Sequence, residues 1–262
     1  MTPSGNASRT ALLIAAHGER GGEGAGANNQ APFRIARGLS ARGLTSEVAV
    51  GFIRGEPSIK DALGTLTAPN IIVYPLFVAN GYFTRDRLAQ LLDEANGEGR
   101  KVDVMAPLGL DPGLPDLAVT FAARAACEHG LEPRACNVIL LAHGSKKNPA
   151  SRQSTERMTH ALEANGSFRS ARSAFLEESP SLQTAVTGIQ GPIVVVGMFS
   201  GEGLHGAKDA PQLVSALRRD DAVFAGVIGS AAGVEDLIAR SVENALHSTG
   251  GVASTGWLSA AR

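Results

Sequence analysis

Short apolar runs recur along the chain, and several of them stop abruptly at a glycine, a histidine or a charged residue. Runs of this length, bounded in this way, are typical of buried β-strands. In the first half of the chain they predict strands at residues 11–16, 47–53, 71–74 and 102–105. In the second half they predict strands at residues 137–142, 170–176, 193–196 and 223–228.

The stretches between these runs predict helices. We expect them at residues 30–41, 59–66, 85–95, 115–129, 150–164 and 233–247, with two more that begin near residues 181 and 209. Strands that alternate with helices indicate βαβ units with right-handed crossovers and parallel sheets. The sequence therefore predicts an α/β fold.

The second half of the chain repeats the pattern of the first. The strands at 11–16 and 137–142 both run into a His-Gly pair, at His17 and His143. Further matching anchors are Phe-Ile at 52–53 and Phe-Leu at 175–176, Pro-Ser at 57–58 and 180–181, and the glycines at 81 and 203. We therefore expect two tandem parallel four-stranded α/β domains related by internal duplication, at residues 10–131 and 132–247, with tails at 1–9 and 248–262. The sequence leaves open on which half the linking helix at 115–129 packs.

Composition narrows the classes of protein that fit. A formal net charge of −1 gives no basic field for nucleic acid. The two cysteines lack CxxC spacing, which favours a reduced, cytosolic protein. The apolar runs are all too short for a transmembrane helix, and residues 1–9 lack the apolar centre of a signal peptide. We expect a cytoplasmic protein with no membrane partner.

Metal-binding side chains follow three strands of the second repeat. His143, Glu177 and His205 lie just beyond the carboxyl ends of these strands, where ligands bind in open parallel sheets. Neighbouring strands lie about 4.8 Å apart, so the three side chains are expected to converge. Two imidazoles and a carboxylate suit a first-row divalent metal, and they can also accept protons. This set fits insertion of a metal into a ring that must lose two N–H protons.

The first repeat carries different groups at the same places. They are His17, Arg54 and, by the glycine anchor, Phe83 or Tyr82. This repeat therefore has a degenerate site, and only the second repeat carries a full set of metal-binding groups. His17 can also have a purely structural role, because a histidine at the end of a strand often only caps the strand or hydrogen-bonds to the backbone. The glycines at 18–26 lack the motifs of a phosphate-binding loop, so the sequence argues against a phosphate-binding site there.

Three short motifs of the second repeat carry a resemblance to a known family. They are His-Gly-Ser at 143–145 with Asn-Pro at 148–149, Phe-Leu-Glu at 175–177 before Pro-Ser, and Gly-Leu-His at 203–205 with Asp-Ala-Pro at 209–211. Together they resemble the signatures of the class II tetrapyrrole chelatases, in particular the sirohydrochlorin cobalto- and ferrochelatases of the long, two-repeat type. The resemblance covers both repeats.

The resemblance implies a chelatase fold. It also implies insertion of Co²⁺ or Fe²⁺ into sirohydrochlorin or a related polycarboxylated tetrapyrrole, in cobalamin or sirohaem biosynthesis, with no organic cofactor. Ni²⁺ suits the same donor set. The metal-binding and catalytic residues carried over are His143, Glu177 and His205. The residues expected to bind the tetrapyrrole are His17, Arg54, Ser145 and Lys146.

Two other functions remain open at this stage. A metal or tetrapyrrole carrier with the same pocket would bind its ligand without turnover. A phosphoryl-transfer hydrolase with His143 as nucleophile is less consistent with the sequence, because no arginine directly precedes either His-Gly pair. Either a monomer or a homodimer is compatible with the duplication.

Overall fold

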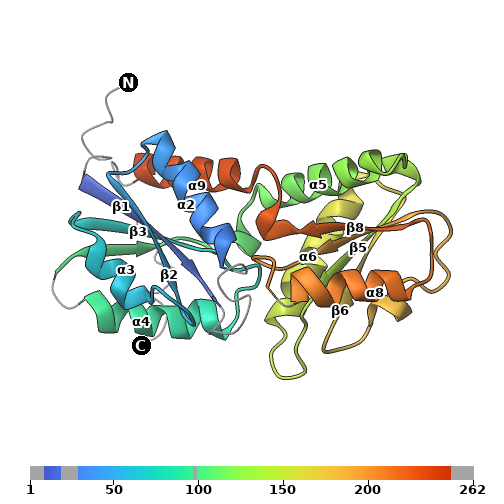
Figure 1. Cartoon of the computed structure of the whole chain (residues 1–262), viewed down its shortest axis with the longest axis horizontal. Coiled ribbons are helices and arrows are strands. Elements are labelled where there is room, and N and C mark those ends of the chain that lie inside the picture. The colour runs from blue at the N-terminus through green and yellow to red at the C-terminus, as the bar shows by residue number, and fades with distance from the viewer. Residues whose placement is uncertain (1–8, 19–28, 97–98, 204, 249–262) are drawn as a thin grey trace. The chain divides into compact units, whose positions relative to one another are not determined.

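The computed structural model describes residues 9–18, 29–96, 99–203 and 205–248 (Figure 1). The predicted tails, apart from Arg9 and Ser248, lie outside the described residues. Most of the glycine-rich loop at 18–26 lies outside them as well.

The first sheet has four parallel strands in the order β2-β1-β3-β4 (Figure 1). Helices α2 and α9 cover one face of this sheet, and α3 and α4 pack together on the other. The bounds are β1 Thr10–Ala16, α2 Gln30–Arg42, β2 Glu47–Phe52, α3 Ile59–Thr65, β3 Asn70–Pro75, α4 Leu88–Asn96, β4 Lys101–Val104 and α9 Val234–Ser248.

The second sheet repeats this topology, with four parallel strands in the order β6-β5-β7-β8. Helices α5 and α6 lie on one face, and α7 and α8 lie on the other. The bounds are α5 Leu114–Glu128, β5 Asn137–Ala142, α6 Ala150–Asn165, β6 Ser170–Phe175, α7 Leu182–Ala185, β7 Ile193–Gly197, α8 Ala210–Ala216 and β8 Ala222–Val227. The predicted elements are therefore present, and their ends differ from the predicted ones by at most three residues.

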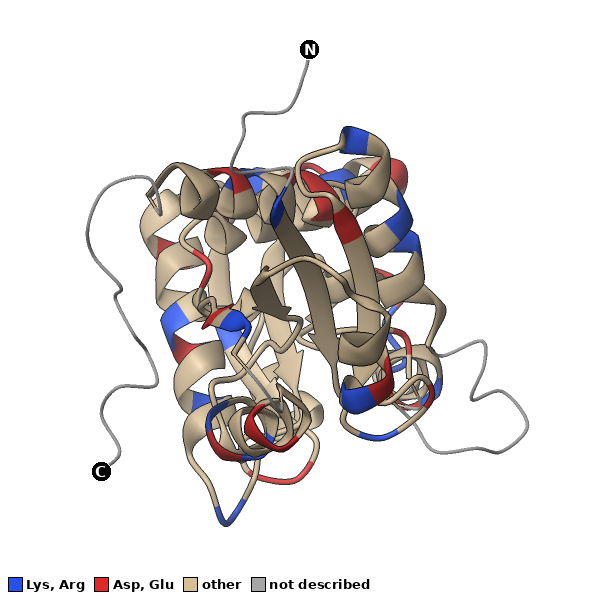
Figure 2. Ribbon diagram, turned by 90° about the vertical axis from the view of Figure 1, so that its left-hand side faces the viewer, with Lys and Arg blue, Asp and Glu red and all other residues tan. Residues whose placement is uncertain are grey.

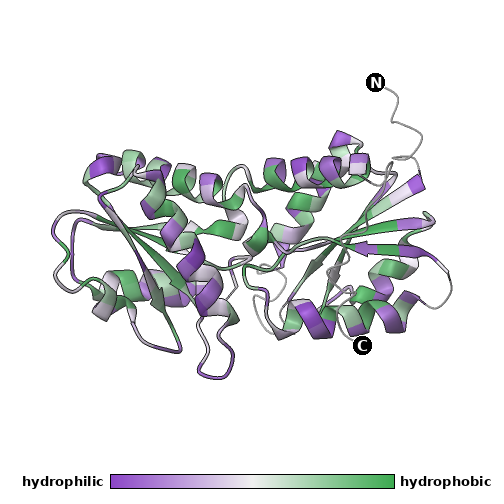
Figure 3. Ribbon diagram, turned by 180° about the vertical axis from the view of Figure 1, so that it is seen from behind, coloured by the Kyte–Doolittle hydropathy of each residue, from purple (hydrophilic) through white to green (hydrophobic). Residues whose placement is uncertain are grey.

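Hydrophobic burial explains why β1 and β5 lie in the interior of their sheets. Every residue of β1 and of β5 is buried, as expected for central strands covered on both faces. Apolar residues concentrate on the strands and on the helix faces turned toward them (Figure 3). Each fully buried Leu, Ile or Val side chain contributes roughly 1.5–3 kcal/mol. On the helices and loops that surround the first sheet, charges of both signs are interspersed (Figure 2).

The last helix of each repeat packs with the sheet of the other repeat. Helix α5 follows β4 in the sequence, but it packs against strands β7 and β8 of the second sheet and against helix α6. Helix α9 follows β8, but it packs against α2, which covers the first sheet. The compact units are accordingly residues 1–111 with 233–262, and residues 112–232. The predicted boundary at residues 131 and 132 describes the duplication in the sequence and does not coincide with these units.

Specific contacts fix α9 in the first unit. The Ser241 hydroxyl donates to the Asp111 carboxylate at 2.6 Å, and the buried Tyr74 hydroxyl donates to the same oxygen at 3.2 Å. Burial and the neighbouring Asp111 carboxylate raise the pKa of Tyr74 far above its ordinary value. Helices α2 and α9 approach closely at Gly38, where a Cβ atom would lie 1.9 Å from the Glu235 carboxylate.

Two π-helical turns were not predicted. They span Phe83–Arg87 before α4 and His205–Asp209 before α8, at matching places in the two repeats. Such turns often occur at functional sites. Within the part of the chain that the structure describes, no helix is both long and apolar enough to cross a membrane.

Candidate metal and proton-transfer site

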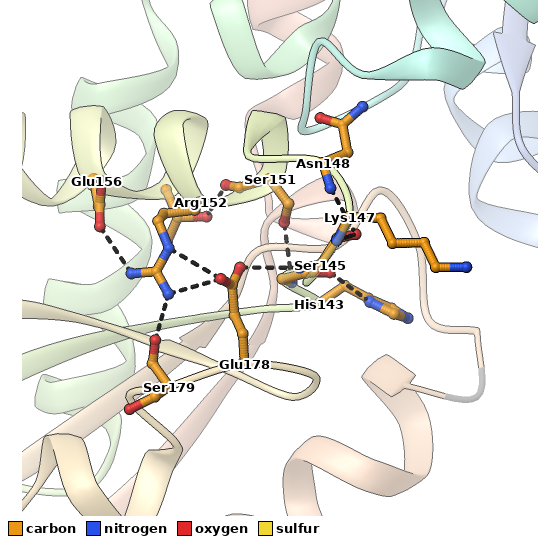
Figure 4. Close-up of polar contacts among 11 residues, drawn as sticks. His143, Ser145, Lys147, Asn148, Ser151, Arg152, Glu156, Glu178 and Ser179 are labelled. Atoms are coloured by element: carbon orange, nitrogen blue, oxygen red, sulfur yellow. Dashed lines mark hydrogen bonds and ion pairs between the residues drawn. The ribbon is translucent and has the colours of Figure 1, made fainter.

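The two histidine loops begin where the central strands end. His17 follows β1 and His143 follows β5, and each is followed by a glycine in the left-handed region, with φ of +71° at Gly18 and +72° at Gly144. A Cβ atom at Gly144 would lie 2.7 Å from the side chain of Glu178. Glycine is therefore required there both by the backbone conformation and by the space available. This turn places the His143 side chain at the exposed edge of the sheet (Figure 4).

The His143 ring is oriented by its own loop. Its Nδ1 lies 2.9 Å from the carbonyl oxygen of Gly144. A carbonyl oxygen can only accept, so Nδ1 carries the hydrogen of the neutral ring and Nε2 carries the lone pair. Nε2 is therefore the atom that can take a proton or a metal ion.

His205 has the same arrangement with a different partner. It is the first residue of the second π-helical turn, and its Nδ1 lies 2.7 Å from Oδ2 of Asp209. The His143 and His205 rings meet edge to face, with centroids 4.7 Å apart and planes at 87°. The structure thus brings together two imidazoles from loops that are far apart in the sequence.

Glu177 lies beside the histidine loop through its backbone. Its N–H donates to the carbonyl oxygen of His143 at 2.9 Å, and its side chain is exposed. In the described ranges, no three His, Cys, Asp or Glu side chains come close enough together to hold a metal. The structure therefore gathers His143 and His205, and the metal-binding role of Glu177 stays a prediction.

A half-buried acid next to Glu177 holds the histidine loop. Glu178 accepts from the backbone N–H of Ser145 at 2.9 Å, and it accepts from Arg152 Nε and Nη2 at 3.0 and 2.7 Å (Figure 4). Burial raises the pKa of Glu178, but these hydrogen bonds outweigh burial and hold the pKa below its usual value. The Arg152 guanidinium also lies 4.6 Å from the centre of the Phe175 ring. This network holds the loop that carries His143. The sequence gave no signal for it, because Arg152 lies in helix α6 and Glu178 in the loop after β6, far apart in the chain.

Ser145 and Lys146, the predicted residues that follow in this loop, differ in their contacts. Ser145 Oγ accepts from the backbone N–H groups of Lys147 and Asn148, both at 3.2 Å, so this hydroxyl shapes the turn. Lys146 is exposed. The substrate-binding roles of Ser145 and Lys146 stay predictions.

The first repeat reproduces the ring pair with different chemistry. His17 and Phe83 meet edge to face, with centroids 4.6 Å apart and planes at 89°. Phe83, and not Tyr82, therefore occupies the place that His205 takes in the second repeat. The Arg54 guanidinium lies 5.6 Å from the centre of the Phe83 ring, and the Arg54 N–H donates to the His17 carbonyl oxygen at 2.7 Å. A phenyl ring and a cation thus stand where the second repeat has an imidazole and a carboxylate.

Comparison with known proteins gives a family match and close structural likenesses. The family model described as CbiX matches residues 11–125 and 137–247. A probable sirohydrochlorin cobaltochelatase of Halobacterium salinarum is 24% identical over 226 residues, which cover 77% of this chain and 75% of that protein.

Two solved structures are similar over almost the whole fold. One is CbiX, described as the terminal enzyme for sirohaem biosynthesis in denitrifying bacteria, with 26% identity and a TM-score of 0.70 over 90% of this chain and 99% of the other. The other is the sirohydrochlorin chelatase SirB from Bacillus subtilis subspecies spizizenii in complex with cobalt. It has 16% identity and a TM-score of 0.72, over 91% of this chain and 96% of the other. The predicted fold, two tandem parallel four-stranded α/β domains of the chelatase type, is confirmed.

Proposed function

The chain belongs to the CbiX family, and we propose that it inserts Co²⁺ or Fe²⁺ into sirohydrochlorin or a closely related tetrapyrrole. This activity would serve cobalamin or sirohaem biosynthesis. The family resemblance predicted from the three motifs of the second repeat is confirmed. In this proposal the metal ion is a substrate, as it is for the cobaltochelatase relative.

The observation that carries the proposal is the paired arrangement of His143 and His205. Both rings are held through Nδ1, and their centroids are 4.7 Å apart. Each ring therefore keeps the lone pair on Nε2, the nitrogen that can bind a divalent cation or accept a proton. Two such atoms at one sheet edge can bring a metal ion to a ring and collect the protons that it displaces.

The reaction exchanges one cation for two protons. A divalent metal replaces the two N–H protons of the macrocycle, so the site must release M²⁺ and receive H⁺ at nearly the same place. We propose that His143 and His205 hold the incoming ion together with the Glu177 carboxylate. As the metal transfers to the ring nitrogens, one imidazole accepts the two pyrrole protons in turn and passes each of them to water.

The substrate's carboxylates require cationic or hydrogen-bonding partners. We assign this role to Arg54 and His17 in the first repeat, and to Ser145 and Lys146 after His143. Arginine suits it because its planar guanidinium binds carboxylates with two parallel hydrogen bonds. We also propose a cytoplasmic location, no nucleic-acid or membrane partner, and function as a monomer or homodimer.

An anaerobic absorbance assay tests the proposal. Sirohydrochlorin is mixed with Co²⁺ or with Fe²⁺, and the loss of the metal-free spectrum is followed for the wild type, His143→Ala and His205→Ala. We expect multiple turnovers by the wild type and large losses of initial rate in both variants. Equal initial rates in all three proteins would contradict the assignment.

The same assay separates an enzyme from a carrier. A carrier that binds metal or tetrapyrrole in this pocket would give a stoichiometric spectral change with no further turnover. Turnover well beyond one equivalent of protein excludes that alternative.

A further inference from the structure

Asp209 lies directly before helix α8, at the position where an acidic side chain commonly caps a helix. Such a cap accepts a hydrogen bond from the second or third backbone N–H of the helix. The Asp209 side chain makes no capping hydrogen bond with α8. Its Oδ2 atom instead lies 2.7 Å from Nδ1 of His205, four residues earlier in the chain. The carboxylate therefore serves the imidazole and not the helix end.

The first repeat offers an internal comparison for this contact. Its π-helical turn, Phe83–Arg87, begins with Phe83 in the place of His205 and ends with Arg87 in the place of Asp209. The Arg87 guanidinium donates to Gln90 at 2.8 Å. The acid is thus present in the repeat with an imidazole and replaced in the repeat with a phenyl ring. A phenyl ring has no N–H for a carboxylate to hold.

We propose that Asp209 is the positioning residue for His205. Its carboxylate accepts the Nδ1 hydrogen, which selects the neutral tautomer with the lone pair on Nε2 and fixes the rotation of the ring. His205 thereby keeps its edge-to-face arrangement with His143. Outer partners of this kind commonly orient metal-binding histidines, and their loss weakens metal binding roughly 10- to 100-fold.

The inference rests on the proposed function only in taking Nε2 of His205 as the metal-binding atom. Two variants test it. Asp209→Ser removes the carboxylate from His205, and helix α8 loses no capping hydrogen bond because Asp209 makes none. Asp209→Asn keeps an oxygen that can accept the Nδ1 hydrogen. The control is Asp220→Ala, which removes an exposed acid near the opposite end of the second sheet.

The first readout is the tautomer of His205, measured at one fixed pH by two-dimensional ¹⁵N–¹H NMR. The signals among the six histidines are assigned with His205→Gln. The second readout is Co²⁺ affinity by titration calorimetry. In Asp209→Ser we expect loss of the pure Nδ1–H tautomer and a roughly 10- to 100-fold weaker Co²⁺ affinity. In Asp209→Asn we expect a smaller loss with the tautomer retained, and in Asp220→Ala no change.

A wild-type tautomer together with wild-type Co²⁺ affinity in Asp209→Ser would overturn the inference. Failure of the proposed function gives a different result, namely no Co²⁺ binding or no turnover by the wild type. In that case the tautomer comparison still decides whether Asp209 positions His205.

Discussion

The ring of Phe83 meets the ring of His17 edge to face, with centroids 4.6 Å apart and planes at 89°. The His143–His205 pair has nearly the same geometry, at 4.7 Å and 87°. The backbone of the first repeat is therefore already arranged for a pair of imidazoles. At the positions that match His205 and Glu177, it carries Phe83 and Arg54 in place of an imidazole and a carboxylate.

This similarity predicts that a metal site can be built in the first repeat. In the background His143→Ala with His205→Ala, adding Phe83→His and Arg54→Glu should restore Co²⁺ binding. The first change supplies an imidazole, and the second replaces a repelling cation with a carboxylate. Titration calorimetry measures the effect, with Phe83→Gln as the control for the ring position. No binding by the correctly folded quadruple variant would show that the backbone match does not suffice.

The left-handed turn at Gly144 predicts a large cost for any side chain there. Gly144 and Gly166 have the same φ, +72°, but a Cβ atom would contact Glu178 at the first and meets nothing within 4 Å at the second. Gly166→Ala should cost about 1–2 kcal/mol from the backbone alone. Gly144→Ala should cost roughly 1–3 kcal/mol more, because it also displaces Glu178. Urea unfolding of both variants measures the difference, and equal losses would show that the contact carries no energy.

The Arg152–Glu178 pair predicts that the conformation of the His143 loop depends on a half-buried ion pair. Replacing Glu178 by Gln leaves Arg152 with a weaker partner and should destabilise the protein by about 1–3 kcal/mol. The matched control is Glu128→Gln in the exposed Arg124–Glu128 pair, where the loss should stay below about 0.5 kcal/mol. The free energy of unfolding from denaturant curves gives both values. Indistinguishable losses would argue against a structural role for the network.

The hydrogen bonds of Glu47, in the first unit, predict that the stability of the fold depends on pH. Burial raises the pKa of Glu47, but hydrogen bonds from Thr67 and Ala68 outweigh this and lower the pKa from its ordinary value of 4.5. A group with a lowered pKa stabilises the fold above its unfolded pKa, and this contribution disappears as the pH falls through the folded pKa.

The stability difference between the wild type and Glu47→Gln should therefore be constant near neutral pH. It should shrink as the pH falls below about 4.5. Unfolding curves at several pH values measure it. A difference that grows on acidification would contradict the direction assigned to this pKa.

Much of the fold could be predicted because the strands are continuous apolar runs with sharp ends. Residues Val138 to Ala142 are buried on both faces, so their sequence is apolar at every position, and the His-Gly pair marks the end of the strand. The exchange of α5 and α9 could not be predicted, because the apolar face of a helix does not specify which of two similar sheets it covers. Their placement depends on tertiary contacts such as that between Ser241 and Asp111.

The candidate site was predictable to a similar degree. His143 and His205 follow strand ends, so topology alone brings them to one edge, and the structure places their rings together. The partners that orient them are set by loop conformation. Asp209 reaches His205 through a π-helical turn, and Glu178 reaches Ser145 across two loops. The hydrophobic periodicity of the sequence predicts neither of these two contacts.

A crystal structure of the protein soaked with Co²⁺ under anaerobic conditions tests the central claim most directly. The account predicts cobalt within about 2.1 Å of Nε2 of both His143 and His205, with the Nδ1 contacts to Gly144 and Asp209 unchanged. Cobalt bound elsewhere, or bound to only one of these histidines, would contradict it.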